Sequence, residues 1–86
     1  EFTIYQNYPN PFNPQTNIKI KILNSTQIKL CVYNSLGQLV KVLYNGHILN
    51  GNYNFTFDAK DLSSGIYICR LETLQSSKSI KMLYIK

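Results

Sequence analysis

Apolar residues in this chain alternate with polar ones over short stretches, and no stretch repeats them at the 3.6-residue interval of a helix. Residues 18–22 read Ile-Lys-Ile-Lys-Ile, residues 28–33 alternate in the same way, and residues 53–57 place three aromatic side chains on one face. Gly, Asn and Ser gather between these stretches. The pattern is typical of short strands that turn one face to a core and the other to water.

The spacing of these stretches predicts an all-β fold, an immunoglobulin-like β-sandwich of about seven antiparallel strands. The expected strands are residues 2–5, 18–22, 28–33, 39–44, 53–57, 66–73 and 79–85. At 86 residues, the chain is long enough for one domain with a modest core.

Several turns are expected between these strands. Gly37 is free to take a positive φ in a hairpin turn before residue 39. Asn45-Gly46 is the strongest short signal for a tight reversal, and with residues 50–52 it is expected to bracket a loop. Residues 58–65 are expected to form a crossing loop, in which short polar side chains cap backbone N–H groups.

All three prolines lie in the run Tyr-Pro-Asn-Pro-Phe-Asn-Pro at residues 8–14. Each proline fixes its own φ and pushes the preceding residue toward extended conformations, so the run predicts a stiff, non-helical arm. Tyr8 and Phe12 would anchor it. We therefore expect residues 1–15 to pack across an open end or edge of a sandwich body formed by residues 16–86, which would protect that edge from aggregation.

The chain carries a formal net charge of +5, but its lysines are spread along the sequence and Arg70 is its only arginine. Nucleic-acid readers cluster their cations on one face, so we expect a solubilising outer surface and no nucleic-acid partner. No stretch approaches the roughly 20 apolar residues of a membrane-spanning helix. The N-terminus has no basic run followed by an apolar stretch, so a signal peptide for export would lie elsewhere. The first residue is Glu1, not Met, and we therefore expect a segment cut from a longer polypeptide.

The residue inventory argues against catalysis. His47 is the only histidine, and it falls in the expected turn-rich loop with no Gly-x-Ser-x-Gly motif in the chain. The four carboxylates, Glu1, Asp58, Asp61 and Glu72, are too scattered for an acid–base pair or a calcium loop. We expect no catalytic residue, no metal site and no cofactor.

Cys31 and Cys69 invite comparison with the inter-sheet disulfide of antibody domains, in which both sulfurs point inward. The phase of residues 28–32 places Cys31 on the outward side, whereas Cys69 shares its phase with Tyr67 and Leu71 and should point inward. Two independent thiols are favoured over a disulfide, and the bonding state stays open.

Several runs of residues carry a family resemblance. Residues 8–14 are followed by Thr-Asn-Ile-Lys-Ile at 16–20, Val-Tyr-Asn-Ser-Leu-Gly-Gln-Leu-Val at 32–40, Ser-Gly-Ile-Tyr-Ile-Cys-Arg-Leu at 64–71 and Lys-Met-Leu-Tyr-Ile-Lys at 81–86. In order, spacing and C-terminal placement, residues 5–86 resemble the type A C-terminal sorting domain of the type IX (Por) secretion system. That family is related to the immunoglobulin-like domains of flagellar hook-capping proteins.

The resemblance implies a non-catalytic targeting domain that directs a larger, N-terminally linked cargo protein across the bacterial outer membrane. The implied location is secreted or at the cell surface, reached through the periplasm. The implied partners are translocon components, a sortase-like peptidase and an anionic lipopolysaccharide, and we expect a monomer.

The resemblance also assigns roles by position. Partner recognition falls to the last run, which consists of Lys81, Met82, Leu83, Tyr84, Ile85 and Lys86. The other motif positions are expected to maintain the fold, and these are Tyr8, Pro9, Asn10, Pro11, Phe12, Leu36, Gly37, Gly65, Tyr67, Arg70 and Leu71.

An alternative from another functional class is an accessory structural or carbohydrate-binding module of a secreted hydrolase or adhesin. It would contact carbohydrate through Tyr33, Tyr44 and Tyr53. Exposed coplanar aromatic rings would favour this alternative, and buried rings would favour the targeting domain. A partner could also be recognised by strand addition at an open sheet edge.

Overall fold

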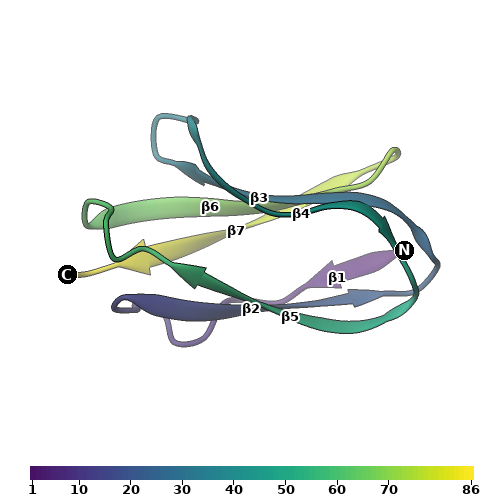
Figure 1. The fold of residues 1–86 in the computed structure, drawn as a ribbon, viewed down its shortest axis with the longest axis horizontal. Coiled ribbons are helices and arrows are strands. Elements are labelled where there is room, and N and C mark those ends of the chain that lie inside the picture. Colours follow the sequence, from purple (N-terminus) through teal and green to yellow (C-terminus); the bar gives the residue numbers. More distant parts are fainter.

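The computed structural model describes residues 1–86, which form seven strands in two facing sheets (Figure 1). One sheet has the order β1 (Phe2–Ile4), β2 (Gln15–Ile22) and β5 (Gly51–Asp58). The other has the order β4 (Leu39–Ile48), β3 (Thr26–Asn34), β6 (Gly65–Glu72) and β7 (Ser77–Tyr84). Every strand pair is antiparallel, which confirms the predicted immunoglobulin-like β-sandwich.

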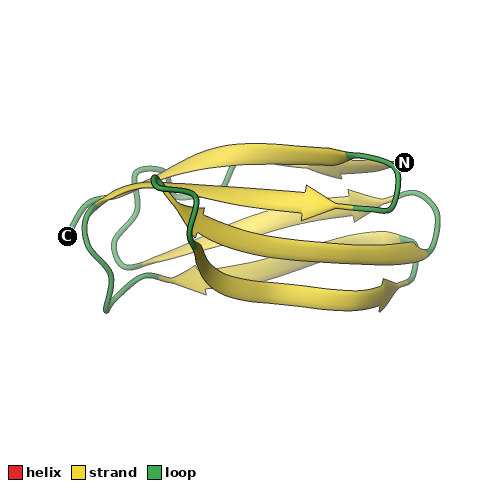
Figure 2. Cartoon of the chain, turned by 90° about the horizontal axis from the view of Figure 1, so that it is seen from above, coloured by secondary structure: helices red, strands yellow, loops and turns green.

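The two termini lie at opposite ends of the molecule, whose longest dimension is 37 Å (Figures 1 and 2). The structure contains no helix long and apolar enough to cross a bilayer.

The alternation seen in the sequence sets which face of each strand is buried. In β2, Ile18, Ile20 and Ile22 are at most 2% exposed, whereas Lys19 and Lys21 face solvent. Burying each such isoleucine stabilises the fold by about 1.5–3 kcal/mol relative to leaving it exposed. The core is a cluster of 16 buried side chains between the two sheets.

The turn between β3 and β4 forms as predicted. Gly37 adopts a φ of 83°, a left-handed conformation that favours glycine, and its N–H donates to the Asn34 carbonyl at 3.0 Å. The Asn34 side-chain oxygen accepts further bonds from the N–H groups of Leu36 and Gln38. This single side chain therefore replaces the backbone partners that the turn lacks.

The crossing loop between β5 and β6 also uses local polar contacts. The Asp58 carboxylate accepts the Lys60 N–H at 2.9 Å, and the Tyr67 hydroxyl donates to the Ser63 carbonyl at 2.6 Å. A tyrosine that reaches back to the loop before its own strand is a feature of immunoglobulin-like sandwiches. Tyr67 fixes the angle at which the chain enters β6.

The prediction of a turn at Asn45-Gly46 was wrong. Both residues lie inside β4, where Asn45 pairs with Lys29 and Gly46 with Ile28. The loop between β4 and β5 is only Leu49 and Asn50, so His47 also lies in a strand. Pairing with the full length of β3 outweighs the local turn preference, because it satisfies the backbone groups of these residues within the sheet.

The proline-rich arm runs along one edge of the sandwich. Beyond β1 it continues beside β2, since the Tyr5 N–H donates to the Lys19 carbonyl and Tyr8 exchanges two backbone bonds with Asn17, each at 3.0 Å. It then crosses to the other sheet, where Phe12 forms a parallel bridge with Tyr84. The arm thus pairs with the part of β2 that β1 leaves unpaired and then with the edge of β7.

Two buried contacts hold this arm in place. Phe12 is 2% exposed and stacks on Tyr84 with 5.3 Å between ring centroids. The second contact is a pair of hydrogen bonds. The Asn7 amide donates to the Thr16 hydroxyl at 2.9 Å, and that hydroxyl donates to the Pro9 carbonyl at 2.7 Å. These hydrogen bonds offset the free-energy cost of removing the polar groups from water.

Tyr8 is not the anchor that the sequence suggested, because its side chain is 80% exposed. Its pairing with Asn17 places both side chains on the outer face of the three-stranded sheet. Phe12 and Asn7 anchor the arm instead.

The two cysteines are free thiols on opposite faces of one sheet. Cys69 lies in the core opposite Val32, whereas Cys31 lies opposite Arg70 on the outer face, as the phase predicted, although it is only 1% exposed there. Burial, with a smaller contribution from Cys31, raises the pKa of the Cys69 thiol to about 12.

Candidate functional site

The six residues expected to bind a partner, residues 81–86, fall into a buried set and an exposed set. Met82 and Tyr84 point into the core and are at most 2% exposed. Lys81, Ile85 and Lys86 are exposed, and Leu83 is partly exposed. The exposed side chains of this run are accessible from solvent, while the buried ones hold the strand in the sandwich.

The exposed side chains of β7 continue onto β6. Lys81 lies opposite Ile68, and Leu83 lies opposite Ile66, so each pair shares the outer face of the four-stranded sheet. Ile66 is 40% exposed. This face combines apolar side chains with a cation at the C-terminal end of the molecule.

The free edge of β7 is covered by the arm over its last residues. The Leu83 N–H donates to the Asn10 side-chain oxygen at 3.0 Å, and the Leu83 carbonyl accepts the Phe12 N–H at 2.9 Å. The Lys81 carbonyl accepts the Gln6 side chain. Strand addition at this part of β7 would require the arm to leave, whereas β4 and β5 each pair with only one strand.

Three of the sequence motifs meet in one aromatic cluster. Phe12 from the arm contacts Phe57 with 6.0 Å between centroids, and Phe57 contacts Tyr67 at 6.1 Å. Tyr84 completes the cluster by stacking on Phe12. Phe57 is not one of the motif positions named above, although the sequence places it on one face with Tyr53 and Phe55.

The remaining motif positions are dispersed. Leu71 is buried in the core, whereas Leu36 is 82% exposed at the tip of a hairpin. Gly65 opens β6, and Arg70 faces solvent, where it pairs with Glu72 at 3.5 Å. Such an exposed ion pair contributes at most about 1 kcal/mol.

The family model described as the secretion system C-terminal sorting domain matches residues 6–86. The chain belongs to this family. No curated protein and no solved structure matches the chain.

A type IX sorting domain directs export across the outer membrane, and the protein that carries it is secreted or displayed at the cell surface. The match begins at residue 6, so it includes the arm from Gln6 onward and every strand except β1. The arm and the terminal strand that it covers therefore belong to the same unit.

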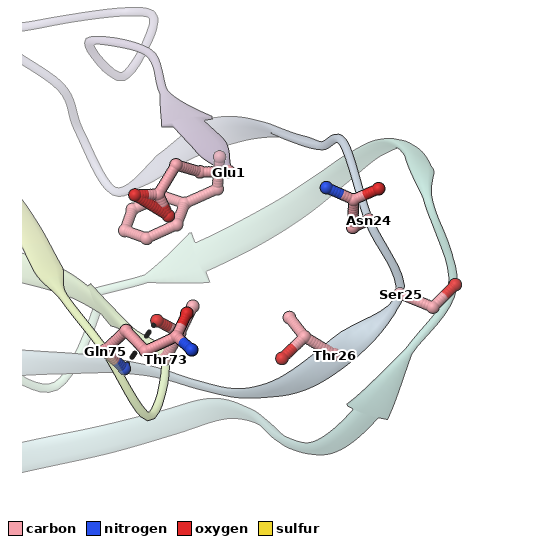
Figure 3. A pocket seen from close by; sticks show the side chains of 7 residues that line it. Glu1, Asn24, Ser25, Thr26, Thr73 and Gln75 are labelled. Atoms are coloured by element: carbon pink, nitrogen blue, oxygen red, sulfur yellow. Dashed lines mark hydrogen bonds between the residues drawn. The ribbon is translucent and has the colours of Figure 1, made fainter.

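None of the hollows on the sorting domain is lined by a histidine. One, of about 410 Å³, lies at the N-terminal end between Glu1, Asn24, Ser25, Thr26, Thr73 and Gln75 (Figure 3). Its lining contains hydroxyl and amide groups and one carboxylate, that of Glu1. His47 is exposed on β4, and no group of three His, Cys, Asp or Glu side chains could hold a metal ion.

The three tyrosines considered for carbohydrate binding form no exposed platform. The Tyr44 hydroxyl donates to the His47 carbonyl at 2.6 Å, and the Tyr53 hydroxyl donates to the Leu49 carbonyl at 2.7 Å. Both rings pack against the core. Tyr33 lies apart on the outer face of β3, where partial burial, with smaller contributions from Cys31 and Glu72, raises its pKa.

Proposed function

We propose that this sorting domain acts without catalysis, as the signal that directs a cargo protein linked to its N-terminus through the type IX translocon. The observation that carries the proposal is the division of the terminal run into buried and exposed residues. Met82 and Tyr84 hold β7 in a folded body, and the outward residues stay available to a partner. Recognition of a folded tail needs both properties.

The surface read by the translocon is the terminal-strand surface, which we define as Lys81, Leu83, Ile85 and Lys86. It offers two cations and two apolar side chains within six residues. A complementary partner would bind it through an apolar contact flanked by acidic groups, the arrangement that gives both affinity and orientation.

We further propose that the domain acts as a monomer and that, after translocation, a sortase-like peptidase separates it from the cargo. The peptidase would cut before the folded body, because protease cleavage needs an extended and accessible chain. Attachment of the released cargo to an anionic lipopolysaccharide would then follow at the new cargo end.

The decisive experiment fuses residues 1–86 to the C-terminus of a reporter that already enters the periplasm of a bacterium with a type IX system. The fusion should bring the reporter to the surface or the medium. The double variant Lys81→Glu, Leu83→Ser should abolish export and leave the domain folded, because both side chains lie outside the core.

The matched control is Lys29→Glu, Leu39→Ser, which changes the same residue types on the same sheet but away from β7. This control should be exported normally. Equal export of both double variants would show that the terminal-strand surface is not read.

A further inference from the structure

The outer face of the three-stranded sheet carries an unusual set of side chains. Across this face, Tyr5 lies beside Lys19 and Lys19 lies opposite Asn54. In the next row, Tyr8 pairs with Asn17, which accepts a hydrogen bond from the Thr56 hydroxyl at 3.0 Å. We call this surface the amide face, made up of Tyr5, Tyr8, Asn17, Lys19, Lys21, Asn52 and Asn54.

The amide face is hollowed rather than flat. A hollow of about 500 Å³ is bordered by Tyr5, Lys19, Asn52 and Asn54, and another of about 370 Å³ by Tyr8, Asn17, Lys19 and Asn54. The two hollows share Lys19 and Asn54, so they form one shallow groove with a tyrosine beside each half. Tyr5 is 46% and Tyr8 80% exposed.

These side chains match the chemistry of a sugar chain. The exposed faces of tyrosine rings suit the apolar C–H faces of pyranose rings. Asn52 and Asn54 each offer both donors and an acceptor to hydroxyl groups, which are themselves donors and acceptors. Asn17, whose oxygen already accepts the Thr56 hydroxyl, offers its amide donors. The outward positions of β2 from Lys21 to Asn17 span about 13 Å, enough for two to three sugar units.

The positive charge of the amide face favours acidic sugar chains over neutral ones. Lys19 and Lys21 are exposed, and the only carboxylate among the strand residues of this face, Asp58, lies at its far end and accepts a bond from Gln15. A ligand in the groove therefore meets positive potential. The face lacks arginine, which nucleic-acid surfaces favour. Its central strand, β2, is paired on both sides, so a peptide could pair with this sheet only at its edges, such as that of β5, and not across the face.

We propose that the amide face binds an acidic polysaccharide, with uronic acid carboxylates on Lys19 and Lys21 and sugar rings against Tyr5 and Tyr8. This activity is separate from recognition by the translocon, because the face lies on the other sheet from the terminal-strand surface. It would let the domain hold acidic polysaccharide at the cell surface, independently of export.

The test is a titration of the ¹⁵N-labelled 86-residue protein with oligogalacturonate, followed by amide chemical shifts. Shifts should gather on β2, β5 and residues 5–8, and maltooligosaccharide of equal length should bind more weakly. Lys19→Gln and Tyr8→Ala should each weaken binding about tenfold without unfolding, because both side chains are exposed. Lys29→Gln, on the other sheet, removes the same charge and should bind normally.

Three results would overturn the proposal. The first is the absence of any oligogalacturonate binding, and the second is an equal loss of affinity in Lys29→Gln, which would indicate only net charge. The third is tighter binding of single-stranded oligonucleotides than of oligogalacturonate by the same face. None of these results bears on export, so the proposed targeting function would stand or fall separately.

Discussion

Phe12 shows how a single residue ties the arm to the rest of the molecule. It lies outside both sheets, yet it is 2% exposed because Tyr84 and Phe57 contact it from different strands. Aromatic pairs of this kind add about 0.5–1.5 kcal/mol beyond their buried area. Phe12 therefore couples the first and last motifs of the sequence through direct contact.

Phe12→Ala is predicted to lower the free energy of unfolding by about 3–5 kcal/mol, because it removes a buried ring and leaves a cavity. A domain of this size has little stability to spare, so a fraction of the variant should be unfolded at 25 °C. Urea denaturation followed by tyrosine fluorescence measures the change. Tyr8→Ala, on the same arm but 80% exposed, should stay within about 0.5 kcal/mol of the parent. Similar losses in both variants would contradict the anchoring role of Phe12.

At the residue scale, the sequence predicted side-chain direction well where a strand alternates strictly. The opposite faces of Cys31 and Cys69 and the positive φ of Gly37 were all confirmed. The exposure of Tyr8 was not predicted, because the proline-rich run has no alternation of its own. Its direction is imposed by pairing with β2, a contact between distant positions that no local pattern encodes.

At the scale of elements, the strand count and the sandwich followed from the pattern, but the length of β4 did not. The dipeptide Asn45-Gly46 is a turn signal in the sequence, but its pairing with β3 makes it part of a strand. The candidate site was likewise predicted only where local alternation determines it. The division of residues 81–86 into buried and exposed sets follows from alternation, whereas the cover that the arm places over β7 depends on contacts more than 70 residues apart in sequence.

The hydrogen bond from the Leu83 N–H of β7 to Asn10 of the arm leads to a prediction for this backbone amide. In Asn10→Ala the Leu83 N–H loses its acceptor, so its hydrogen exchange should accelerate about tenfold while the other β7 amides keep their rates. Exchange followed by NMR measures this residue by residue. Asn10→Asp retains an acceptor oxygen and should restore protection. If Leu83 exchanges at the parental rate in Asn10→Ala, the arm does not protect the edge through this contact.

At the scale of the whole molecule, the two ends of the chain have different surroundings. Glu1 lies at one end of the long axis beside the polar hollow, and Lys86 lies at the other (Figures 1, 2 and 3). The last residues are fixed, because the Ile85 N–H donates to the Phe12 carbonyl and the Lys86 N–H donates to the Ser64 hydroxyl. A cargo joined before Glu1 therefore stands a domain length away from the terminal-strand surface.

This arrangement predicts that the position of an added domain decides export. A small folded domain joined before Glu1 should be exported, since the 37 Å length of the sandwich separates it from Lys86. The same domain joined after Lys86 should block export by covering Ile85 and Lys86, and a three-residue Gly-Ser-Gly extension should reduce it less. Surface labelling in whole cells measures all three fusions, and thermal unfolding of the purified proteins checks that each sandwich is intact. Equal export with the domain at either end would mean that the translocon reads a surface far from the C-terminal end.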